Sequence, residues 1–224
     1  MPTLKPKLIS FDVFGTLISV RDSSYGAFEM ILKKANAIHV DVKAFWEHWE
    51  HRNIARYWDA YLPYKKICEL SLADTFATYG VVADPGLIEL YFEAFPKFFL
   101  YDDVVATLEK LSTQHRIALV SNIDDDLLAM TPLPRLFDLV CTAQRAQGYK
   151  PDGKLFRYLI DQSELPVGDI LHCGQSQYTD LVGGKPVGLQ VAWINRRSVA
   201  LDPAVPKPDF VFTGIAEVCD LVRR

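Results

Sequence analysis

No apolar run in this 224-residue sequence approaches the ~20 residues that a membrane-spanning helix needs. The first ten residues, MPTLKPKLIS, also lack the long apolar segment of a signal peptide. The four cysteines (Cys68, Cys141, Cys173 and Cys219) lie far apart and form no CxxC pair. We therefore expect a cytoplasmic protein without a membrane span, whose cysteines are reduced side chains of the core.

A basic face is missing as well. The chain has 24 Lys and Arg against 28 Asp and Glu, a net charge of -4, and these charges are spread along the sequence. No zinc-finger spacing and no aromatic-rich arginine stretch occurs, so we expect no nucleic-acid partner and look for a small-molecule substrate. With 50% apolar residues, the chain can build one α/β domain and a smaller accessory unit.

Short apolar runs bounded by turn residues predict buried strands. Helical patterns precede two of them, with Val104, Leu108 and Leu111 before the second run and Leu155 to Ile160 before the third. This alternation predicts an α/β fold with a parallel sheet and helices on both faces. The runs are KLISFD (7–12), RIALVSN (116–122), DILHCG (169–174), GLQVAWIN (188–195) and DFVF (209–212).

The segment from about Tyr25 to Phe99 breaks this alternation, because it contains helical spacing and no convincing strand. This segment begins directly after the turn that follows the first strand. We therefore predict two units, a core formed by residues 1–20 and 100–224 and an all-helical cap domain formed by residues 21–99.

Polar residues follow the predicted strands at their carboxyl ends, where open parallel sheets bind ligands. They could bring a nucleophile, hydrogen-bond donors, a cation and a second carboxylate to one cleft. Each taken alone also has a structural explanation, such as a helix cap or a solvated loop residue, so their joint placement carries the argument. The residues that follow strands are Asp12, Thr16, Ser121, Asn122, Gln175, Ser176 and Asp180, and Lys150 lies in the loop YKPDG that leads to a helix.

This ordered set resembles the four motifs of the haloacid dehalogenase superfamily of hydrolases. The motifs stand here as DVFGT (12–16), VSN (120–122), YKPDGKLF (149–156) and GQSQYTD (174–180). The resemblance covers the whole chain and implies a Rossmann-like, doubly wound core with a type 1 cap inserted after the first strand. It also implies that Asp12 is the nucleophile.

Two positions depart from the phosphatase branch of that superfamily, which has acids where this chain has Phe14 and Gln175. Phe14 cannot protonate a leaving alkoxide, and Gln175 offers Mg²⁺ a neutral oxygen in place of an anionic one. A departing halide needs neither a proton nor a metal. The motif DVFGTL (12–17) instead resembles the L-2-haloacid dehalogenase branch, which implies a metal-independent enzyme without a cofactor that acts on short 2-haloalkanoic acids.

The mechanism implied by this resemblance begins when Asp12 attacks the halogen-bearing carbon and forms an aspartyl ester. We expect Lys150 to keep Asp12 ionised. Thr16 and Ser176 are suited to orient its carboxylate, although hydroxyl residues in turns often bond only to the backbone.

Water then hydrolyses the ester, and Asp180 is the candidate general base because it is the remaining carboxylate of the fourth motif. Ser121 is expected to bind the substrate carboxylate, and Asn122 to help solvate the departing halide. Phe14 and Gln175 are expected beside the substrate. These roles are carried over by position.

In this branch an arginine of the cap binds the halide, and Arg52, or with less support Arg56, is the candidate here. Both residues could equally be solvent-facing residues of an amphipathic helix. Phe156 stands where some dehalogenases have a tyrosine six residues after the lysine.

The alternative functions are a phosphatase or another hydrolase with the same nucleophile, and a non-enzymatic binding module. The resemblance also leaves a homodimer open.

Overall fold

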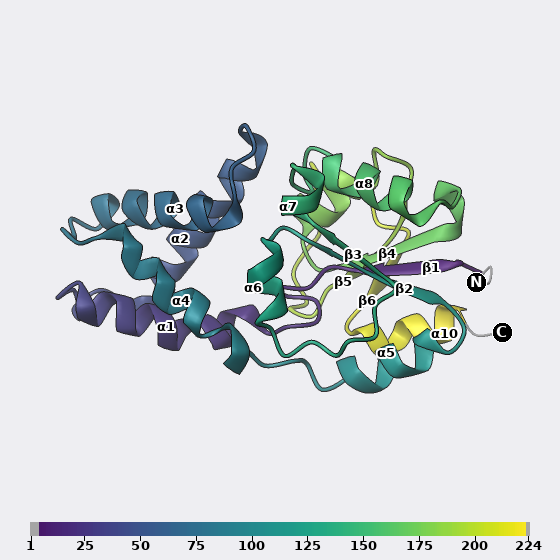
Figure 1. Ribbon diagram of the computed structural model, residues 1–224, viewed down its shortest axis with the longest axis horizontal. Helices are drawn as coiled ribbons and strands as arrows, with labels where there is room; N and C mark the ends of the chain where they lie inside the picture. Colours follow the sequence, from purple (N-terminus) through teal and green to yellow (C-terminus); the bar gives the residue numbers. More distant parts are fainter. Residues whose placement is uncertain (1–4, 223–224) are drawn as a thin grey trace.

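A parallel sheet of six strands forms the centre of the larger lobe in the computed structural model, which describes residues 5–222 (Figure 1). The strand order is β3-β2-β1-β4-β5-β6, and every pair of neighbours is parallel. The predicted α/β fold class is confirmed. The strands are β1 (Leu8–Phe11), β2 (Arg116–Ser121), β3 (Leu139–Thr142), β4 (Ile170–Gly174), β5 (Gln190–Ile194) and β6 (Phe210–Phe212).

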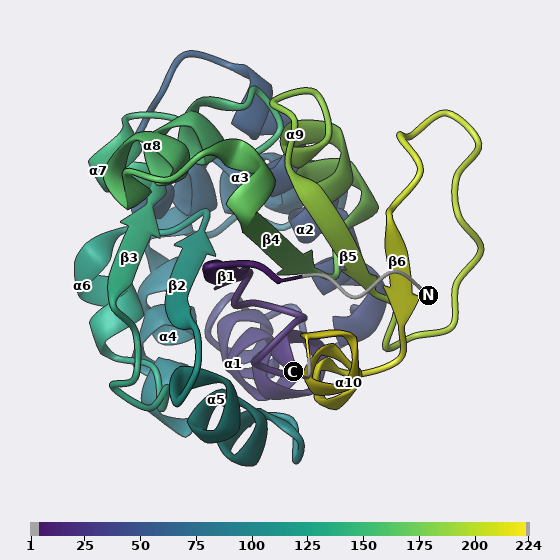
Figure 2. The ribbon, with the colours of Figure 1, turned by 90° about the vertical axis from the view of Figure 1, so that its right-hand side faces the viewer.

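Helices cover both faces of this sheet, as Figure 2 shows in a view along the strands. Helices α5 (Val104–Ser112) and α10 (Val218–Val222) lie on one face. Helices α7 (Ala143–Ala146), α8 (Lys154–Ser163) and α9 (Val182–Gly184) lie on the other. Strands β1 and β4 are buried along their whole length, which explains why both read as continuous apolar runs.

Strand β3 is a correction to the sequence analysis, which predicted five strands and none at residues 139–142. The strand is four residues long and pairs only with β2. Leu139 and Val140 are half-buried because they lie on the edge of the sheet. A short edge strand has too few buried apolar residues to stand out from the loops around it.

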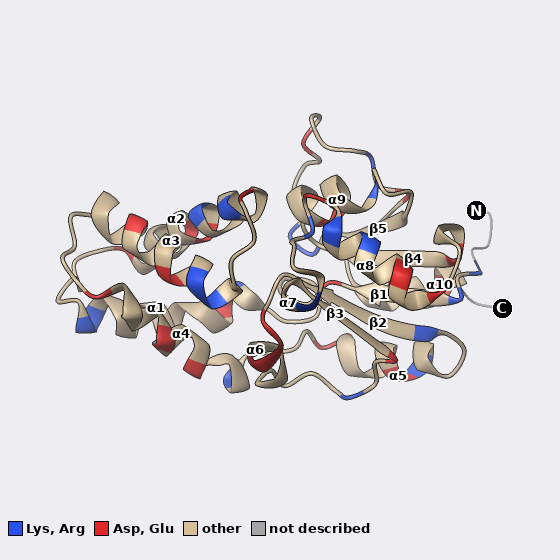
Figure 3. Cartoon of the chain, turned by 45° about the horizontal axis from the view of Figure 1, so that its top comes forward, with Lys and Arg blue, Asp and Glu red and all other residues tan. Residues whose placement is uncertain are grey.

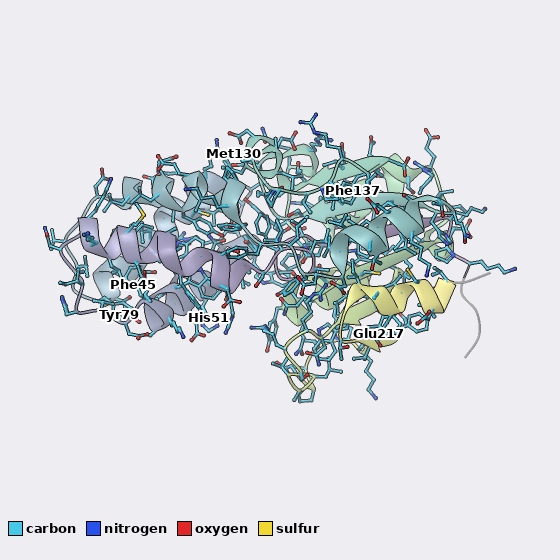
Figure 4. All side chains as sticks on the ribbon, turned by 90° about the horizontal axis from the view of Figure 1, so that it is seen from below. Phe45, His51, Tyr79, Met130, Phe137 and Glu217 are labelled. Carbon is cyan, nitrogen blue, oxygen red and sulfur yellow. The ribbon has the colours of Figure 1, made fainter. Side chains whose placement is uncertain are left out.

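The smaller lobe lies at the left of Figure 1 and consists of helices α1 (Val20–Lys34), α2 (Val42–Ala55), α3 (Tyr64–Thr78) and α4 (Glu89–Glu93). In the described chain no strand lies between β1 and β2. Aromatic side chains fill the interior of this cap. Figure 4 labels Phe45 and Tyr79, whose rings lie 5.1 Å apart.

Shorter turns of helix complete the chain. Three lie in or next to the cap, η1 (Arg56–Trp58), η2 (Pro85–Ile88) and η3 (Phe95–Lys97), and three in the core, η4 (Val167–Asp169), the π-helical η5 (Gln177–Leu181) and η6 (Ile215–Glu217). Helix α6 (Asp125–Ala129) lies at the junction of the two lobes, where acidic residues colour it red in Figure 3.

Side chains of the core hold the start of cap helix α3. The Asp124 carboxylate is buried and accepts hydrogen bonds from the backbone N–H groups of Tyr64 (2.9 Å) and Lys65 (3.0 Å). The Tyr149 hydroxyl donates to the carbonyl oxygen of Leu62 at 2.7 Å. These contacts satisfy donors that a helix start leaves unpaired, and they fix the cap against the core.

All four cysteines are buried thiols, which confirms the expectation of reduced cysteines in the core. Among the described residues, no helix combines the length and the apolar character required to cross a bilayer.

Candidate active site

The carboxyl ends of β1, β2 and β4 face the cap, and a cavity of about 490 Å³ lies between them. Its floor includes Asp12, Ser121 and Lys150 of the core, and its walls include Trp46 and Trp49 of helix α2. The site therefore forms where an open parallel sheet is expected to bind ligands, with the cap closing it from above.

Asp12 follows the last residue of β1, and its side chain is only slightly exposed. Its backbone N–H donates to the carbonyl oxygen of Cys173 at 3.0 Å, so the residue is held like a continuation of the strand. The Thr16 hydroxyl donates to Asp12 Oδ2 at 2.7 Å, and Lys150 Nζ donates to Asp12 Oδ1. The expected contact of Thr16 with Asp12 is present, because the turn after β1 brings position 16 back to position 12.

That turn requires glycine at position 15, where φ is +90°. A Cβ atom there would lie 2.5 Å from the side-chain oxygen of Gln175. The sequence Gly15-Thr16 thus allows a tight return of the chain and a close approach to the loop after β4.

The Lys150 ammonium bridges two carboxylates. Besides Asp12, it donates to Asp180 Oδ1 at 2.8 Å, and all three side chains are buried. The backbone carbonyl of Lys150 is packed so closely that a Cβ atom at Gly183 would lie 1.9 Å from its oxygen. Glycine at position 183 therefore lets helix α9 approach the loop that carries the lysine.

Burial and the shared ammonium shift the ionisation of these groups. Burial raises the pKa of Asp12 above its ordinary value, although Lys150 opposes this shift. Burial also disfavours the charged form of Asp180, but Lys150 and a hydrogen bond from His172 outweigh it and lower the pKa of that carboxyl. Burial lowers the pKa of Lys150, yet the two carboxylates outweigh it and raise that pKa. The ammonium is therefore charged at neutral pH and is the group that favours the anionic form of Asp12.

Asp180 is held on its far side by two residues that the sequence analysis missed. His172 Nε2 lies 3.1 Å from Asp180 Oδ1, and His172 Nδ1 lies 2.9 Å from the Ser10 hydroxyl. Since the Asp180 carboxylate only accepts hydrogen bonds, Nε2 carries the proton and Nδ1 accepts from Ser10. The strand register pairs Ser10 of β1 directly with His172 of β4. The sequence did carry a signal for this pair, because Ser10 and His172 are polar residues inside otherwise apolar runs.

Asp180 does not line the cavity. Its Oδ2 accepts the backbone N–H of Ser176 at 2.9 Å, so both of its oxygens are engaged by the protein. It lies in the π-helical turn η5, whose wider spacing brings its side chain back toward β4. A Cβ atom at Gly174 would lie 2.3 Å from the Asp180 carboxyl carbon, so glycine is needed there too.

The Ser176 hydroxyl is directed away from the expected role of orienting Asp12. It accepts the backbone N–H of Thr179 at 3.2 Å and thus caps the turn η5. Instead, the backbone N–H of Gln175 donates to the Thr16 hydroxyl at 2.9 Å. The loop after β4 therefore supports Asp12 through Thr16.

The remaining predicted core residues line the cavity. Ser121 is buried at the end of β2, and Asn122 Oδ1 accepts the backbone N–H of Lys150 at 2.9 Å. Phe14 lies against the end of the cap, with its ring 5.5 Å from that of Phe95. Gln175 also faces the cavity.

Phe156 lies beneath this floor. Its ring is buried edge-on against His172, with the ring centres 4.7 Å apart. It does not line the cavity.

The structure does not bring Arg52 to the cavity, and this corrects the position expected for it. The residue is exposed, and its Nε donates to His48 Nε2 at 3.3 Å on the outer side of α2. Arg56 is turned to Asp74 at 2.6 Å. The arginines that line the cavity are Arg21 and Arg197, which the helical spacing of α2 could not indicate because neither lies on that helix.

The acidic groups of the floor do not suit a divalent metal ion. Magnesium requires near-octahedral oxygen ligands, usually including carboxylates. Here Phe14 and Gln175 contribute no charge, while Asp12 and Asp180 are both turned to the Lys150 ammonium. Within residues 5–222, no three His, Cys, Asp or Glu side chains are grouped to hold a metal.

Comparisons with known proteins found both a dehalogenase and a phosphatase among the similar sequences. (S)-2-haloacid dehalogenase 4A of Burkholderia cepacia is 24% identical over 197 residues, which is 84% of this chain and 82% of that protein. N-acylneuraminate-9-phosphatase of Homo sapiens is 26% identical over 129 residues, covering 55% of this chain and 52% of that protein.

Among solved structures, L-2-haloacid dehalogenase from Xanthobacter autotrophicus with chloropropionic acid covalently bound has a TM-score of 0.83 at 21% identity and covers 97% of this chain and 98% of that one. This likeness shows the fold. The model of the haloacid dehalogenase-like hydrolases matches residues 6–188. The chain therefore belongs to the family of haloacid dehalogenase-like hydrolases.

Proposed function

We propose that this hydrolase releases halide from 2-halo carboxylic acids without a metal ion, with Asp12 as the nucleophile. The observation that carries the proposal is the buried pairing of Asp12 with Lys150, next to Phe14 at the position where a phosphatase of this superfamily has a second acid. The floor of the site then offers an anion and a cation, but no second carboxyl group at position 14 that could protonate a leaving alkoxide.

The first half of the reaction is a displacement at carbon. An Asp12 oxygen attacks C2 of the substrate, the carbon–halogen bond breaks, and the halide leaves with the electron pair. Thr16 fixes the carboxylate in one orientation through its 2.7 Å hydrogen bond, which limits the geometry of attack. Ser121 and Asn122 line the same cavity and can donate to the substrate carboxylate and to the leaving halide.

The second half is hydrolysis of the ester. Water attacks the Asp12 carbonyl carbon, the bond between that carbon and the substrate oxygen breaks, and the 2-hydroxy acid leaves while Asp12 is restored. Asp180 can act here in two ways, by taking the proton of the water or by positioning Lys150, to which it bonds at 2.8 Å. The variant Asp180→Asn separates them. A proton-acceptor role predicts accumulation of ester on Asp12, whereas a positioning role predicts that both halves slow together.

The test of the function is chloride release from L-2-chloropropionate in the presence of a chelator. We expect release that is unchanged by chelator or by added Mg²⁺. Single turnover in heavy-oxygen water should place the label in the Asp12 side chain. Halide release with no label in Asp12 would contradict the nucleophile, and absence of release from any 2-halo acid would contradict the proposal.

A phosphatase is the second candidate, because part of the chain is similar to N-acylneuraminate-9-phosphatase. That activity should require Mg²⁺ and disappear with chelator. The neutral Gln175 and the apolar Phe14 argue against it, since a phosphoryl group brings negative charge that a metal must offset.

A further inference from the structure

The cap side of the cavity carries charges that the displacement chemistry at Asp12 does not use. Arg21 comes from the first turn of α1, Glu50 from α2, and Arg197 from the turn that follows β5, and all three line the cavity. The two arginines thus reach this wall from different lobes of the molecule. Both arginines lie near the Glu50 carboxyl group.

Arg21 is held in place by the cap. Its guanidinium lies over the ring of Trp46, 5.5 Å from the ring centre, and its Nη1 pairs with Glu47 at 3.3 Å. Arg197 is exposed, and in the described part of the chain no hydrogen bond or ion pair engages its side chain. A guanidinium with free donors at a cavity wall is suited to bind a carboxylate in a bidentate manner.

Glu50 offsets only part of this positive charge. The residue is half-buried, and burial raises its pKa to about 7, although Arg21 and Arg197 both oppose the shift. Part of the Glu50 population is therefore protonated near neutral pH. Because Glu47 pairs with Arg21, the positive charge that is left for a ligand at this wall is mainly that of Arg197. Both arginines lower the pKa of Glu50, so both lie close enough to act on its carboxyl group.

The size and lining of the cavity point to a ligand larger than a three-carbon acid. A volume of about 490 Å³ falls within the range of pockets that enclose drug-sized molecules. Aromatic rings that suit an apolar body also line the cavity. They include Phe14, Trp46, Trp49, Tyr57, Trp58 and Tyr91.

We propose that the substrate carries a second anionic group, separated from the reacting carbon by an apolar chain or ring, and that Arg197 together with Arg21 binds this group. The inference rests on the proposed function, because the reacting carbon is defined by Asp12. It names the substrate class as halogenated diacids or comparable dianions, with the aromatic wall covering the spacer.

The test compares 2-bromohexanoate with 2-bromohexanedioate, which differ in the terminal carboxylate. We expect kcat/KM to be about tenfold higher for the diacid. The variant Arg197→Gln should remove this preference and leave the monoacid within twofold of the parent. Arg135→Gln is the matched control, since Arg135 is exposed and lies outside the cavity. Equal rates for the two acids, or equal loss on both in Arg197→Gln, would overturn the inference and leave the dehalogenase proposal standing.

A binding measurement keeps the inference testable if no halide is released. Titration calorimetry with adipate and hexanoate, which carry no halogen, reports the second-anion site independently of the reaction. Adipate should bind about tenfold more tightly than hexanoate, and Arg197→Gln should abolish the difference. Equal affinity for both acids would reject the site. In that way, failure of the chemistry and failure of the site give different results.

Discussion

The floor of the cavity and its cap wall, the charged wall formed by Arg21, Glu50 and Arg197, differ in how their charged side chains are paired. On the floor, each charged side chain has partners within the protein, and the chain from Ser10 through His172, Asp180 and Lys150 to Asp12 is buried and hydrogen-bonded. On the cap wall, Arg197 is exposed and Glu50 has two arginines nearby.

This difference suits the floor to the reaction itself and the wall to the choice of substrate. Groups that are locked by buried partners hold one geometry, which a displacement at carbon requires. Groups with free donors can accept ligands of various shapes. We therefore expect changes on the floor to affect the rate of all substrates, and changes on the wall to affect the choice among them.

The largest effect is expected for Asp12→Asn, which removes the nucleophile from the floor. Activity on any 2-halo acid should fall on the order of 10⁴-fold, because no other carboxylate lines the floor at that point. Halide release measures the loss. Asp161→Asn, an exposed position on α8, should keep the parent rate. Retention of full activity by Asp12→Asn would refute the assignment.

Lys150→Met should be next in size, because it leaves two carboxylates buried without their cation. Loss of one partner of a buried ion pair costs about 3–5 kcal/mol, so urea unfolding should shift accordingly. The pKa of Asp12, which burial already raises, should rise further without the ammonium that opposes the shift. The acid limb of the pH profile of kcat/KM should therefore move to higher pH. Lys110→Met on the exposed face of α5 serves as control, and an unmoved acid limb would contradict the role of Lys150.

His172→Leu tests whether the floor depends on residues that never meet the substrate. It removes a hydrogen bond that lowers the pKa of Asp180 and also leaves the Ser10 hydroxyl without its acceptor. We expect a roughly 10- to 100-fold loss of kcat through misplacement of Lys150. KM should change little, because His172 lies outside the cavity. Ser10→Ala should also lower kcat, by a smaller factor. A rise in KM as large as the fall in kcat would argue for general damage to the fold.

The smallest effects are expected from a pair of glycines, one in each lobe. Gly183→Ala places a Cβ atom 1.9 Å from the Lys150 carbonyl oxygen, whereas Gly26→Ala in cap helix α1 meets nothing within 4 Å. The first should destabilise the protein by about 1–3 kcal/mol. The second should stabilise it by about 0.5–1 kcal/mol, since alanine favours a helix interior over glycine. Thermal unfolding of the two variants should show shifts of opposite sign.

Most of the floor could be predicted from the sequence because its residues follow apolar strands, and parallel strands bring their carboxyl ends together. Hydrogen bonds join Thr16 to Asp12, Asp12 to Lys150, and Lys150 to Asp180. The Ser10–His172 pair could not be assigned, because it depends on the register between β1 and β4. Strand periodicity does not determine which strands are neighbours.

The cap wall was predicted less well for a related reason. The resemblance to the dehalogenase branch suggested Arg52 as the cap arginine of the cavity, but helical spacing gives only the faces of the helix and not which face packs inward. The aromatic residues Phe45, Trp46 and Trp49 occupy the buried face, and Arg52 is left outside. Arg21 and Arg197 reach the wall from opposite lobes, so their meeting depends on how cap and core dock.

The Asp124 carboxylate gives that docking a local reporter. Because it accepts the amide hydrogens of Tyr64 and Lys65 from across the lobe junction, the two amides are shielded from solvent only while the junction is closed. The hydrogen-exchange rates of these two amides therefore measure how often the junction opens. A ligand that bridges the lobes should slow them.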